Sequence, residues 1–143
     1  MTTIAYKDGV IAVDSRQTRR DAIVSDNALK WQIVDGVAFF LAGAVCDNKA
    51  LIAAYFGTPS STPIECSGYV VHDGKLMMVG HDEDSGVWRQ DLELSNPDAI
   101  GSGAPYALAA MDMGASAEEA VRAAMKRDIY TGGTIRTFTI PAS

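Results

Sequence analysis

MTTIAYKDGVIAVD, residues 1–14, is the stretch on which the prediction of the fold rests. Two alternating runs, residues 3–7 and 10–14, flank the pair Asp8-Gly9. An Asp-Gly pair accepts the positive φ angles of a tight type I′ turn, so this stretch is expected to form a β-hairpin. A two-residue turn places the end of the second strand beside the start of the first. Asp14 is therefore expected to lie near Thr2.

The same turn signal recurs at Asp35-Gly36 and Asp73-Gly74. Each pair lies between two apolar or alternating runs, so two more hairpins are expected, over residues 29–42 and 68–80. Further strands are expected over residues 87–94 and 134–140.

Helices are expected between and after these hairpins, over residues 47–56, 103–113 and 116–127. Ser116 and Glu119 have the spacing of a capping box at the start of the last helix. Residues 57–67, which contain Thr, Pro, Ser and Gly, are expected to form a loop. Hairpins first, helices next and a strand last predict an α+β fold in which helices are layered on antiparallel sheet.

The composition predicts one soluble globular domain over residues 1–143. The net charge is −6 and no Lys/Arg run stands out, which argues against nucleic acid or an anionic membrane as the partner. No apolar stretch approaches the length of a membrane span, and no secretory signal is visible. Cys46 and Cys66 are too few for a disulfide framework, so a cytoplasmic location is expected.

Thr2 is the first candidate for chemistry. If Met1 is removed, Thr2 carries a free α-amine on the carbon next to the one that bears its hydroxyl, and such an amine titrates at about pH 8. One residue then supplies both the nucleophile and the general base. The alternative is an ordinary strand residue, and the Met-Thr dipeptide taken alone favours that alternative.

Three more residues are expected to converge on Thr2. Asp14 ends the strand that pairs with the first one, and Lys30 begins the next hairpin, where a buried or paired lysine supplies positive charge. Gly43 follows the end of that hairpin among small residues, so its N–H is a candidate donor to an oxyanion. Taken singly, Asp14 also suits a turn cap and Lys30 a solvated strand position. Convergence on Thr2 accounts for all three positions together.

An ordered set of motifs resembles proteasome β-subunits and the bacterial HslV peptidase, which are N-terminal-nucleophile hydrolases. The set comprises Thr2-Thr3-Ile4, Gly9 with residues 14–18 (DSRQT), Lys30, residues 41–44 (LAGA), residues 101–107 (GSGAPYA) and residues 127–133 (RDIYTGG). The resemblance extends from Thr2 to about Ile140. It implies the four-layer αββα sandwich of that family, with two antiparallel sheets between helix layers and with reduced helices after the first hairpins.

The resemblance also implies roles for individual residues. Thr2 resembles the nucleophile, and Asp14 and Lys30 resemble the acid–lysine pair that tunes it. Gly43 resembles the oxyanion donor. The hydrogen-bonding group around the threonine amine is matched by Ser102, Asp128 and Thr131. Taken alone, Ser102 also suits a helix N-cap, and Asp128 also suits a pair with a neighbouring basic residue.

Six positions match those that line the substrate groove of the family: Gln17, Thr18, Arg19, Ala28, Leu41 and Val45. Thr18 and Gly43 would offer backbone hydrogen bonds to an extended peptide. Leu41 and Val45 predict an apolar pocket for the side chain that precedes the scissile bond. In HslV-like members, backbone carbonyls after the last helix hold a monovalent cation such as sodium, and the matching residues are Met125, Asp128 and Thr131.

The activity implied is that of a threonine endopeptidase that cleaves peptides or unfolded polypeptide inside a homo-oligomeric ring. No organic or redox cofactor is required, and an ATPase unfoldase is the partner typical of HslV-like members. The chain departs from the family pattern after residues 41–43, where one short helix is expected in place of two long ones. Because those helices build contacts between subunits, a catalytically idle scaffold subunit of a ring stays an alternative. An amidase acting on small molecules is another.

Overall fold

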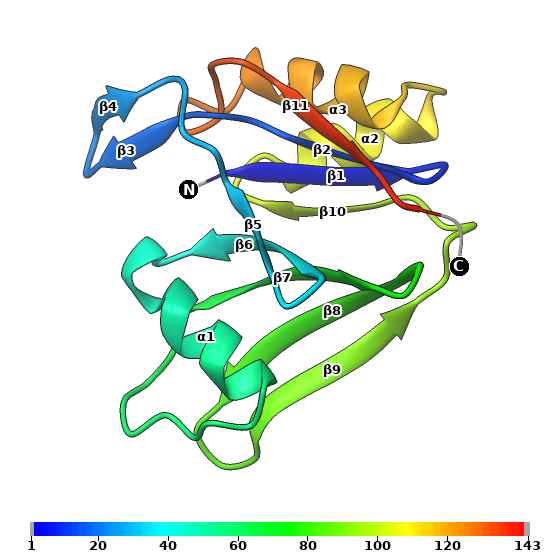
Figure 1. The fold of residues 1–143 in the computed structure, drawn as a ribbon. Helices are drawn as coiled ribbons and strands as arrows, with labels where there is room; N and C mark the ends of the chain where they lie inside the picture. The colour runs from blue at the N-terminus through cyan, green and yellow to red at the C-terminus, as the bar shows by residue number, and fades with distance from the viewer. Residues whose placement is uncertain (1, 142–143) are drawn as a thin grey trace.

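The computed structural model describes residues 2–141, and two antiparallel sheets face each other within it (Figure 1). One sheet has the strand order β10-β1-β2-β11. Its strands are β1 (Thr3–Lys7), β2 (Val10–Val13), β10 (Asp98–Gly101) and β11 (Arg136–Thr139). The other sheet runs in sequence order and consists of β5 (Trp31–Val34), β6 (Val37–Gly43), β7 (Cys66–His72), β8 (Lys75–Asp82) and β9 (Gly86–Leu92).

Helices cover the outer faces of both sheets (Figure 1). α2 (Ala104–Asp112) and α3 (Ala117–Met125) pack on β1 and its neighbours. The 3₁₀ turn η1 (Val45–Asp47) leads into α1 (Asn48–Tyr55), which packs on the five-stranded sheet. The order of layers is therefore helix, sheet, sheet, helix, and the expected four-layer αββα sandwich is confirmed. Among residues 2–141, no helix has the length and apolar character needed to cross a membrane.

The three Asp-Gly pairs form the tight turns predicted for them. Asp8 and Gly9 have φ angles of 51° and 81°, and the pairs at residues 35–36 and 73–74 share this left-handed conformation. In the first hairpin, Ile4 pairs with Val13 in the antiparallel register. This register leaves Thr2 and Asp14 together at the open end of the hairpin.

Strand alternation decides which side chains enter which layer. Ile4 and Tyr6 of β1 are fully buried between the two sheets, where they join the cluster that contains Phe40 of β6. Ala5 lies between them in the sequence and belongs to the cluster under the helices with Ala120 of α3. Fully burying a large apolar side chain stabilises the fold by about 1.5–3 kcal/mol, so the side chains of this inter-sheet layer contribute substantially to stability.

Three strands were not predicted, and none has a strong pattern. β3 (Gln17–Arg19) and β4 (Ala22–Ser25) form a separate two-stranded hairpin that is largely exposed, so alternation leaves no signal there. β10 has four residues and is specified by its pairing with β1. The single short helix α1 agrees with the reduced helical layer expected after β6, and a loop connects it to β7.

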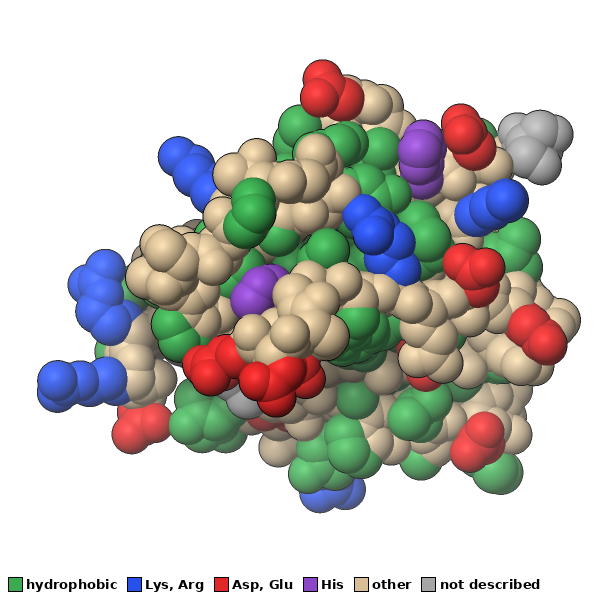
Figure 2. Space-filling model, turned by 90° about the horizontal axis from the view of Figure 1, so that it is seen from below, with side chains coloured by type: hydrophobic (Ala, Val, Ile, Leu, Met, Phe, Trp, Pro, Cys, Tyr) green, Lys and Arg blue, Asp and Glu red, His purple; other side chains and the backbone are tan. Residues whose placement is uncertain are grey.

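Charges are dispersed on the face of the molecule that Figure 2 shows. Figure 2 views the molecule from the side on which α1 lies, and the basic side chains on this face are scattered singly among acidic and apolar ones. This distribution agrees with the low basic content of the sequence, which has 12 Lys and Arg against 18 Asp and Glu.

Candidate active site

Thr2 lies at the open end of the first hairpin, immediately before β1, and is 4% exposed. Its Oγ1 donates a hydrogen bond to Oδ1 of Asp14, the residue that follows β2. The two-residue turn of this hairpin brings these positions together, as the sequence predicted.

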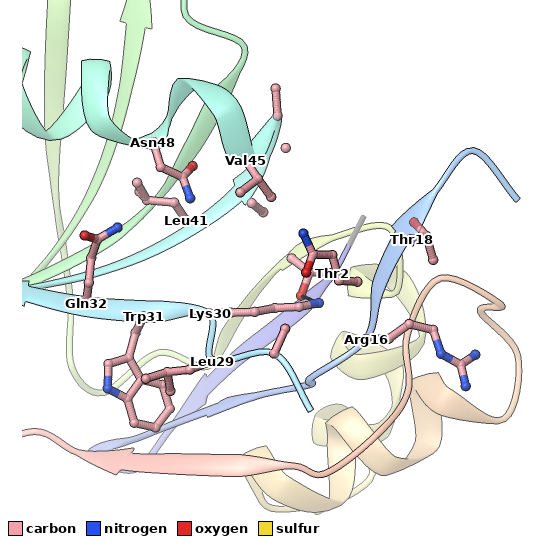
Figure 3. Close-up of a pocket in the computed structure, with 15 residues that line it drawn as sticks. Thr2, Arg16, Thr18, Leu29, Lys30, Trp31, Gln32, Leu41, Val45 and Asn48 are labelled. Atoms are coloured by element: carbon pink, nitrogen blue, oxygen red, sulfur yellow. Dashed lines mark hydrogen bonds between the residues drawn. The ribbon is translucent and has the colours of Figure 1, made fainter. Parts of the chain in front are cut away.

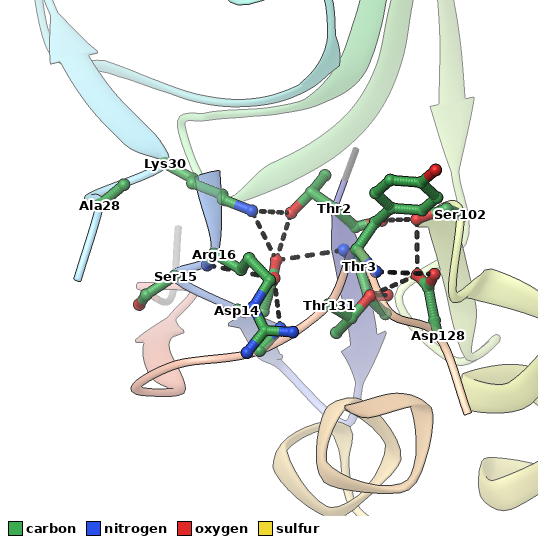
Figure 4. Close-up of polar contacts among 12 residues, drawn as sticks. Thr2, Thr3, Asp14, Ser15, Arg16, Ala28, Lys30, Ser102, Asp128 and Thr131 are labelled. Atoms are coloured by element: carbon green, nitrogen blue, oxygen red, sulfur yellow. Dashed lines mark hydrogen bonds and ion pairs between the residues drawn. The ribbon is translucent and has the colours of Figure 1, made fainter. Parts of the chain in front are cut away.

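Lys30 reaches the same point from the second hairpin. It precedes β5, and its Nζ lies 2.7 Å from Thr2 Oγ1 and 2.9 Å from Asp14 Oδ1 (Figure 4). Burial lowers the pKa of the Lys30 ammonium, because desolvation disfavours the charged form, and the Asp14 carboxylate offsets part of this effect. The threonine hydroxyl therefore contacts a buried cation and a buried anion at once.

Asp14 is held by backbone as well as by side chains. Its carboxylate accepts the N–H of Thr3 at 3.2 Å, of Gly132 at 3.0 Å and of Arg16 at 3.3 Å. The residue is 1% exposed, and an ionised carboxylate that deep is tolerated only when its oxygens are paired. These donors orient Oδ1 toward Thr2 and Lys30.

A second polar cluster lies on the other side of the Thr2 backbone. Asp128 Oδ2 accepts hydrogen bonds from Ser102 Oγ at 2.6 Å and from Thr131 Oγ1 at 2.5 Å. Ser102 Oγ also lies 3.5 Å from the Thr2 carbonyl oxygen. Burial acts to raise the pKa of Asp128, but the hydrogen bonds from these two hydroxyls and from the Tyr130 N–H outweigh it, so the pKa is lowered. Figure 4 shows the cluster beside Thr2 and Thr3.

Two glycines allow the chain to pass close to the first strand. A Cβ on Gly101 would lie 1.8 Å from the Thr2 carbonyl oxygen, and one on Gly103 would lie 2.0 Å from Thr3 Oγ1. Gly101 also has a φ of 98°, which disfavours any other residue. The turn that carries Ser102 therefore approaches Thr2 through positions that exclude side chains.

Gly43, at the end of β6, has a φ of 112°, and a Cβ there would lie 2.5 Å from the Glu65 carbonyl oxygen. The residue lines two cavities, both of which also contain Thr2. Its backbone is thus exposed to the space next to the candidate nucleophile. The role of its N–H as an oxyanion donor stays a prediction.

The first cavity has a volume of about 360 Å³ and opens beside Lys30 and Thr2. Figure 3 shows Leu41, Val45 and Asn48 together on one wall, with Lys30 and Thr2 facing them. Five of the six predicted groove residues line it: Gln17, Thr18, Ala28, Leu41 and Val45. The sixth, Arg19, lies outside this lining, on the exposed hairpin of β3 and β4.

The residues predicted to hold a cation lie around the end of α3. Met125 is the last residue of that helix, and Asp128 and Thr131 lie in the turn that follows. The Asp128 carbonyl oxygen already accepts the Thr131 N–H at 3.1 Å. A carbonyl oxygen has a second lone pair, so the sodium site stays a prediction.

Several residues of the site were not singled out from the sequence. The Thr3 hydroxyl lies 2.7 Å from Thr131 Oγ1, and Gly132 N–H binds Asp14. Arg16 pairs with Asp26 at 2.8 Å, and Arg136 of β11 donates to Ser15 Oγ and to the Ala28 carbonyl oxygen. No local sequence pattern predicts these contacts, because each joins residues from different segments of the chain.

Comparison with protein-family models and with curated proteins finds no match. Comparison with solved structures finds BPH from Thiobacillus denitrificans, with a TM-score of 0.71, 20% identity, and coverage of 99% of this chain and 98% of that one. The same protein in complex with epoxomicin gives a TM-score of 0.70 at 20% identity, with the same coverage. HslV from Trypanosoma brucei gives 0.67 at 20% identity, covering 96% of this chain and 97% of that one.

The chain has the HslV fold. The alignment with the Trypanosoma brucei protein extends over nearly the whole of both chains. Within this fold, Thr2, Asp14 and Lys30 occupy one buried point at the end of the sandwich. The likeness establishes the fold.

Proposed function

We propose that this chain is a threonine peptidase with Thr2 as its nucleophile. The observation that carries the proposal is the position of the Thr2 hydroxyl, which contacts the Lys30 ammonium and the Asp14 carboxylate where two cavities meet. A threonine hydroxyl is a weak nucleophile at its ordinary pKa. A cation at 2.7 Å from Oγ1 favours the alkoxide form, and the fixed carboxylate keeps that cation in place.

The reaction requires removal of Met1, which frees the Thr2 amine. Thr2 Oγ1 attacks the carbonyl carbon of the substrate, and the amine accepts the hydroxyl proton. The Gly43 N–H donates to the oxyanion of the tetrahedral intermediate. The intermediate collapses to an ester on Thr2, and the leaving amine takes the proton. Water then hydrolyses the ester, with the Thr2 amine again acting as the base.

The second polar cluster supports the amine in this proposal. Asp128, Ser102 and Thr131 are joined by hydrogen bonds, and Ser102 reaches the Thr2 carbonyl oxygen. A carboxylate with a lowered pKa stays ionised at neutral pH and favours the protonated amine that forms after attack. The group therefore positions the base and balances its charge.

Other parts of the proposal come from the resemblance rather than from the site geometry. An extended peptide or unfolded polypeptide would bind along the first cavity, and copies of the chain would form a homo-oligomeric ring. The resemblance also suggests an ATPase unfoldase as partner and a cytoplasmic location. It further suggests a sodium ion near Asp128 and Thr131. The fold shared with HslV supports the ring and the peptide substrate.

The test combines intact mass with cleavage of a fluorogenic peptide panel. The expected result is loss of Met1 and cleavage of peptides with an apolar residue before the scissile bond. Thr2→Ala should abolish turnover, and Thr2→Ser should keep part of it because serine retains the amine and the hydroxyl. Full activity of Thr2→Ala would disprove the proposal. Cleavage of small amides but of no peptide would favour an amidase.

One observation favours a second candidate, an idle scaffold subunit of a ring. α1 has 8 residues and is followed by a loop, so the layer that builds subunit contacts in the family is reduced to a single short helix. A scaffold subunit would keep Met1 and show no turnover. Native mass spectrometry of a sample whose intact mass is known separates the two candidates, because a ring that retains Met1 supports the scaffold.

A further inference from the structure

A second cavity also borders Thr2, and its lining includes residues of β7, β8, β9 and β10, none of which line the first cavity. It has a volume of about 440 Å³ and shares Thr2, Ala42 and Gly43 with the first cavity. A bond held over Thr2 therefore borders two cavities with different linings. The new inference concerns what the second cavity binds, and it rests on the proposed peptidase function.

Trp88 of β9 is the largest side chain among the residues that line this cavity. It pairs directly with Gly80 of β8, and a Cβ on Gly80 would lie 2.3 Å from Cζ2 of the indole. The indole therefore packs closely against the backbone at Gly80, where an added side chain would clash with it. Trp88 is 38% exposed, so part of the indole remains open after Gly80 is covered.

Strand alternation places this indole on the inner face of its sheet. Met78, two residues before Gly80, packs in the cluster between the two sheets, and side chains two residues apart share a face. Trp88 is opposite Gly80 and shares that face. The opposite wall of the cavity comes from the other sheet, through Ile100 and Gly101. The indole is thus directed toward the sheet that carries Thr2.

We propose that the second cavity binds the residue that follows the scissile bond and prefers an aromatic side chain, which stacks on Trp88. The first cavity has the apolar wall of Leu41 and Val45 for the residue before the bond, so the leaving part of the substrate occupies the second. An offset or edge-on aromatic pair is favoured beyond its buried area.

Charge does not decide this preference. Glu65 is the acidic residue among those that line the cavity, and it is exposed, so its attraction for a basic side chain is screened by water and salt. A stacked aromatic pair of about 1.4 kcal/mol corresponds to a tenfold effect, so we expect kcat/KM to be up to about tenfold higher for an aromatic residue than for glycine.

The first test uses quenched fluorescent peptides that are identical before the scissile bond and carry phenylalanine, leucine, glycine or lysine after it. Wild type should prefer phenylalanine. Trp88→Ala should lose the preference, Trp88→Phe should keep most of it, and Gly80→Ala should reduce it by displacing the indole. Leu108→Ala is the matched control, because Leu108 is 37% exposed on α2 and outside both cavities. Equal rates for all four peptides, a preference for lysine, or a preference that survives Trp88→Ala would overturn the proposal.

The second test reads binding without turnover. In the Thr2→Ala, Trp31→Phe variant, Trp88 is the remaining tryptophan, since the chain has 2. Phenylalanyl-alanyl-alanine amide mimics the released fragment and should change its fluorescence at lower concentration than glycyl-alanyl-alanine amide. Equal titrations would overturn the proposal. Wild type that cleaves no peptide at all would instead disprove the peptidase function, and the binding result would still decide whether the cavity selects aromatic residues.

Discussion

Lys30 Nζ lies 2.7 Å from Thr2 Oγ1, although the two residues are 28 positions apart in the chain. The contact joins the start of the second hairpin to the open end of the first. The lysine is well buried, with 12% of its side chain exposed, so its charge acts on the hydroxyl with little screening by solvent. This pair determines the reactivity proposed for Thr2.

Replacing Lys30 by Met should remove most of the activity, and it should also lower stability because the buried Asp14 carboxylate loses its partner. The cation at Thr2 Oγ1 is lost, and by analogy with removal of one oxyanion donor we expect kcat to fall by about 10²–10³-fold with little change in KM. Steady-state kinetics with one fluorogenic peptide measures both. Intact mass must first establish that the variant has lost Met1 to the same extent as wild type. A rise in KM with kcat unchanged would contradict the role assigned to Lys30.

Asp14→Asn should destabilise the protein, because it leaves the Lys30 ammonium buried without its partner. Breaking a buried ion pair by removing one partner costs about 3–5 kcal/mol. Urea unfolding of wild type, Asp14→Asn, Lys30→Met and the double variant gives the coupling free energy. The double variant should be more stable than Asp14→Asn. If the double variant is less stable than Asp14→Asn, an unpaired Lys30 ammonium is not the source of the destabilisation.

Gly101→Ala should disturb Thr2 directly. The added Cβ would meet the Thr2 carbonyl oxygen at 1.8 Å, so the backbone must shift, in addition to the strain of a φ of 98°. Gly9→Ala is the control, because Gly9 has a φ of 81° and open space around it. We expect an overpacking cost of about 1–3 kcal/mol for Gly101→Ala beyond that of the control, with loss of activity in Gly101→Ala alone. Thermal unfolding and peptide cleavage measure the two effects.

Stability should fall at alkaline pH because of Tyr69. Burial raises the pKa of its phenol, and the hydrogen bond from Tyr69 to Asp98 at 2.6 Å adds to the increase. The folded state therefore keeps this proton when the unfolded chain has lost it. The contribution is complete below the unfolded pKa of about 10 and is lost above it, by about 1.4 kcal/mol per pH unit.

Urea unfolding between neutral pH and pH values above that of free tyrosine checks this prediction. Tyr69→Phe should show a shallower decline than wild type over the alkaline range. It should also be less stable at neutral pH, by about 1.5–3 kcal/mol, because a hydrogen bond to a charged group is lost. Parallel declines for the two proteins would rule out Tyr69 as the source.

Arg136→Met should lower activity through the position of Lys30. Arg136 Nη1 donates to Ser15 Oγ at 2.8 Å and to the Ala28 carbonyl oxygen at 2.9 Å, so it ties the segment before Lys30 to the residue after Asp14. A displacement of about 1 Å at a reacting group can reduce the rate by up to 10²-fold. We expect kcat to fall in Arg136→Met. In Arg136→Ala, which leaves space for the missing group, added guanidinium chloride should partly restore kcat. Unchanged kcat in a folded variant would show that the tie is only structural.

Much of the fold was predictable because its signals are local. The Asp-Gly turns defined three hairpins, and the capping box of Ser116 and Glu119 is present at the start of α3. β3 and β4 were missed because their side chains are exposed, so no alternation marks them. β10 was missed because four residues carry too little pattern, and only the edge of β1 specifies it.

The candidate site divides in the same way. Asp14 follows from the geometry of one hairpin, since turn length alone places it beside Thr2. Arg19 was placed in the groove by resemblance, and the exposed hairpin that carries it holds it outside the first cavity. Trp88 was assigned to a strand without any role. Nothing near it in the sequence shows that it pairs with Gly80 or that it lines a cavity together with Thr2.

The sequence by itself determined the hairpins, the helices and the identity of a threonine that gains a free amine when Met1 is removed. These depend on turn chemistry, capping and periodicity, which act over a few residues. Strand pairing and the packing of the two sheets decided the rest: Gly101 under the Thr2 carbonyl and Trp88 on Gly80 through pairing within a sheet, and Lys30 against Thr2 through the approach of the second hairpin to the first. Such contacts join distant segments through close packing, and only the folded chain brings those segments together.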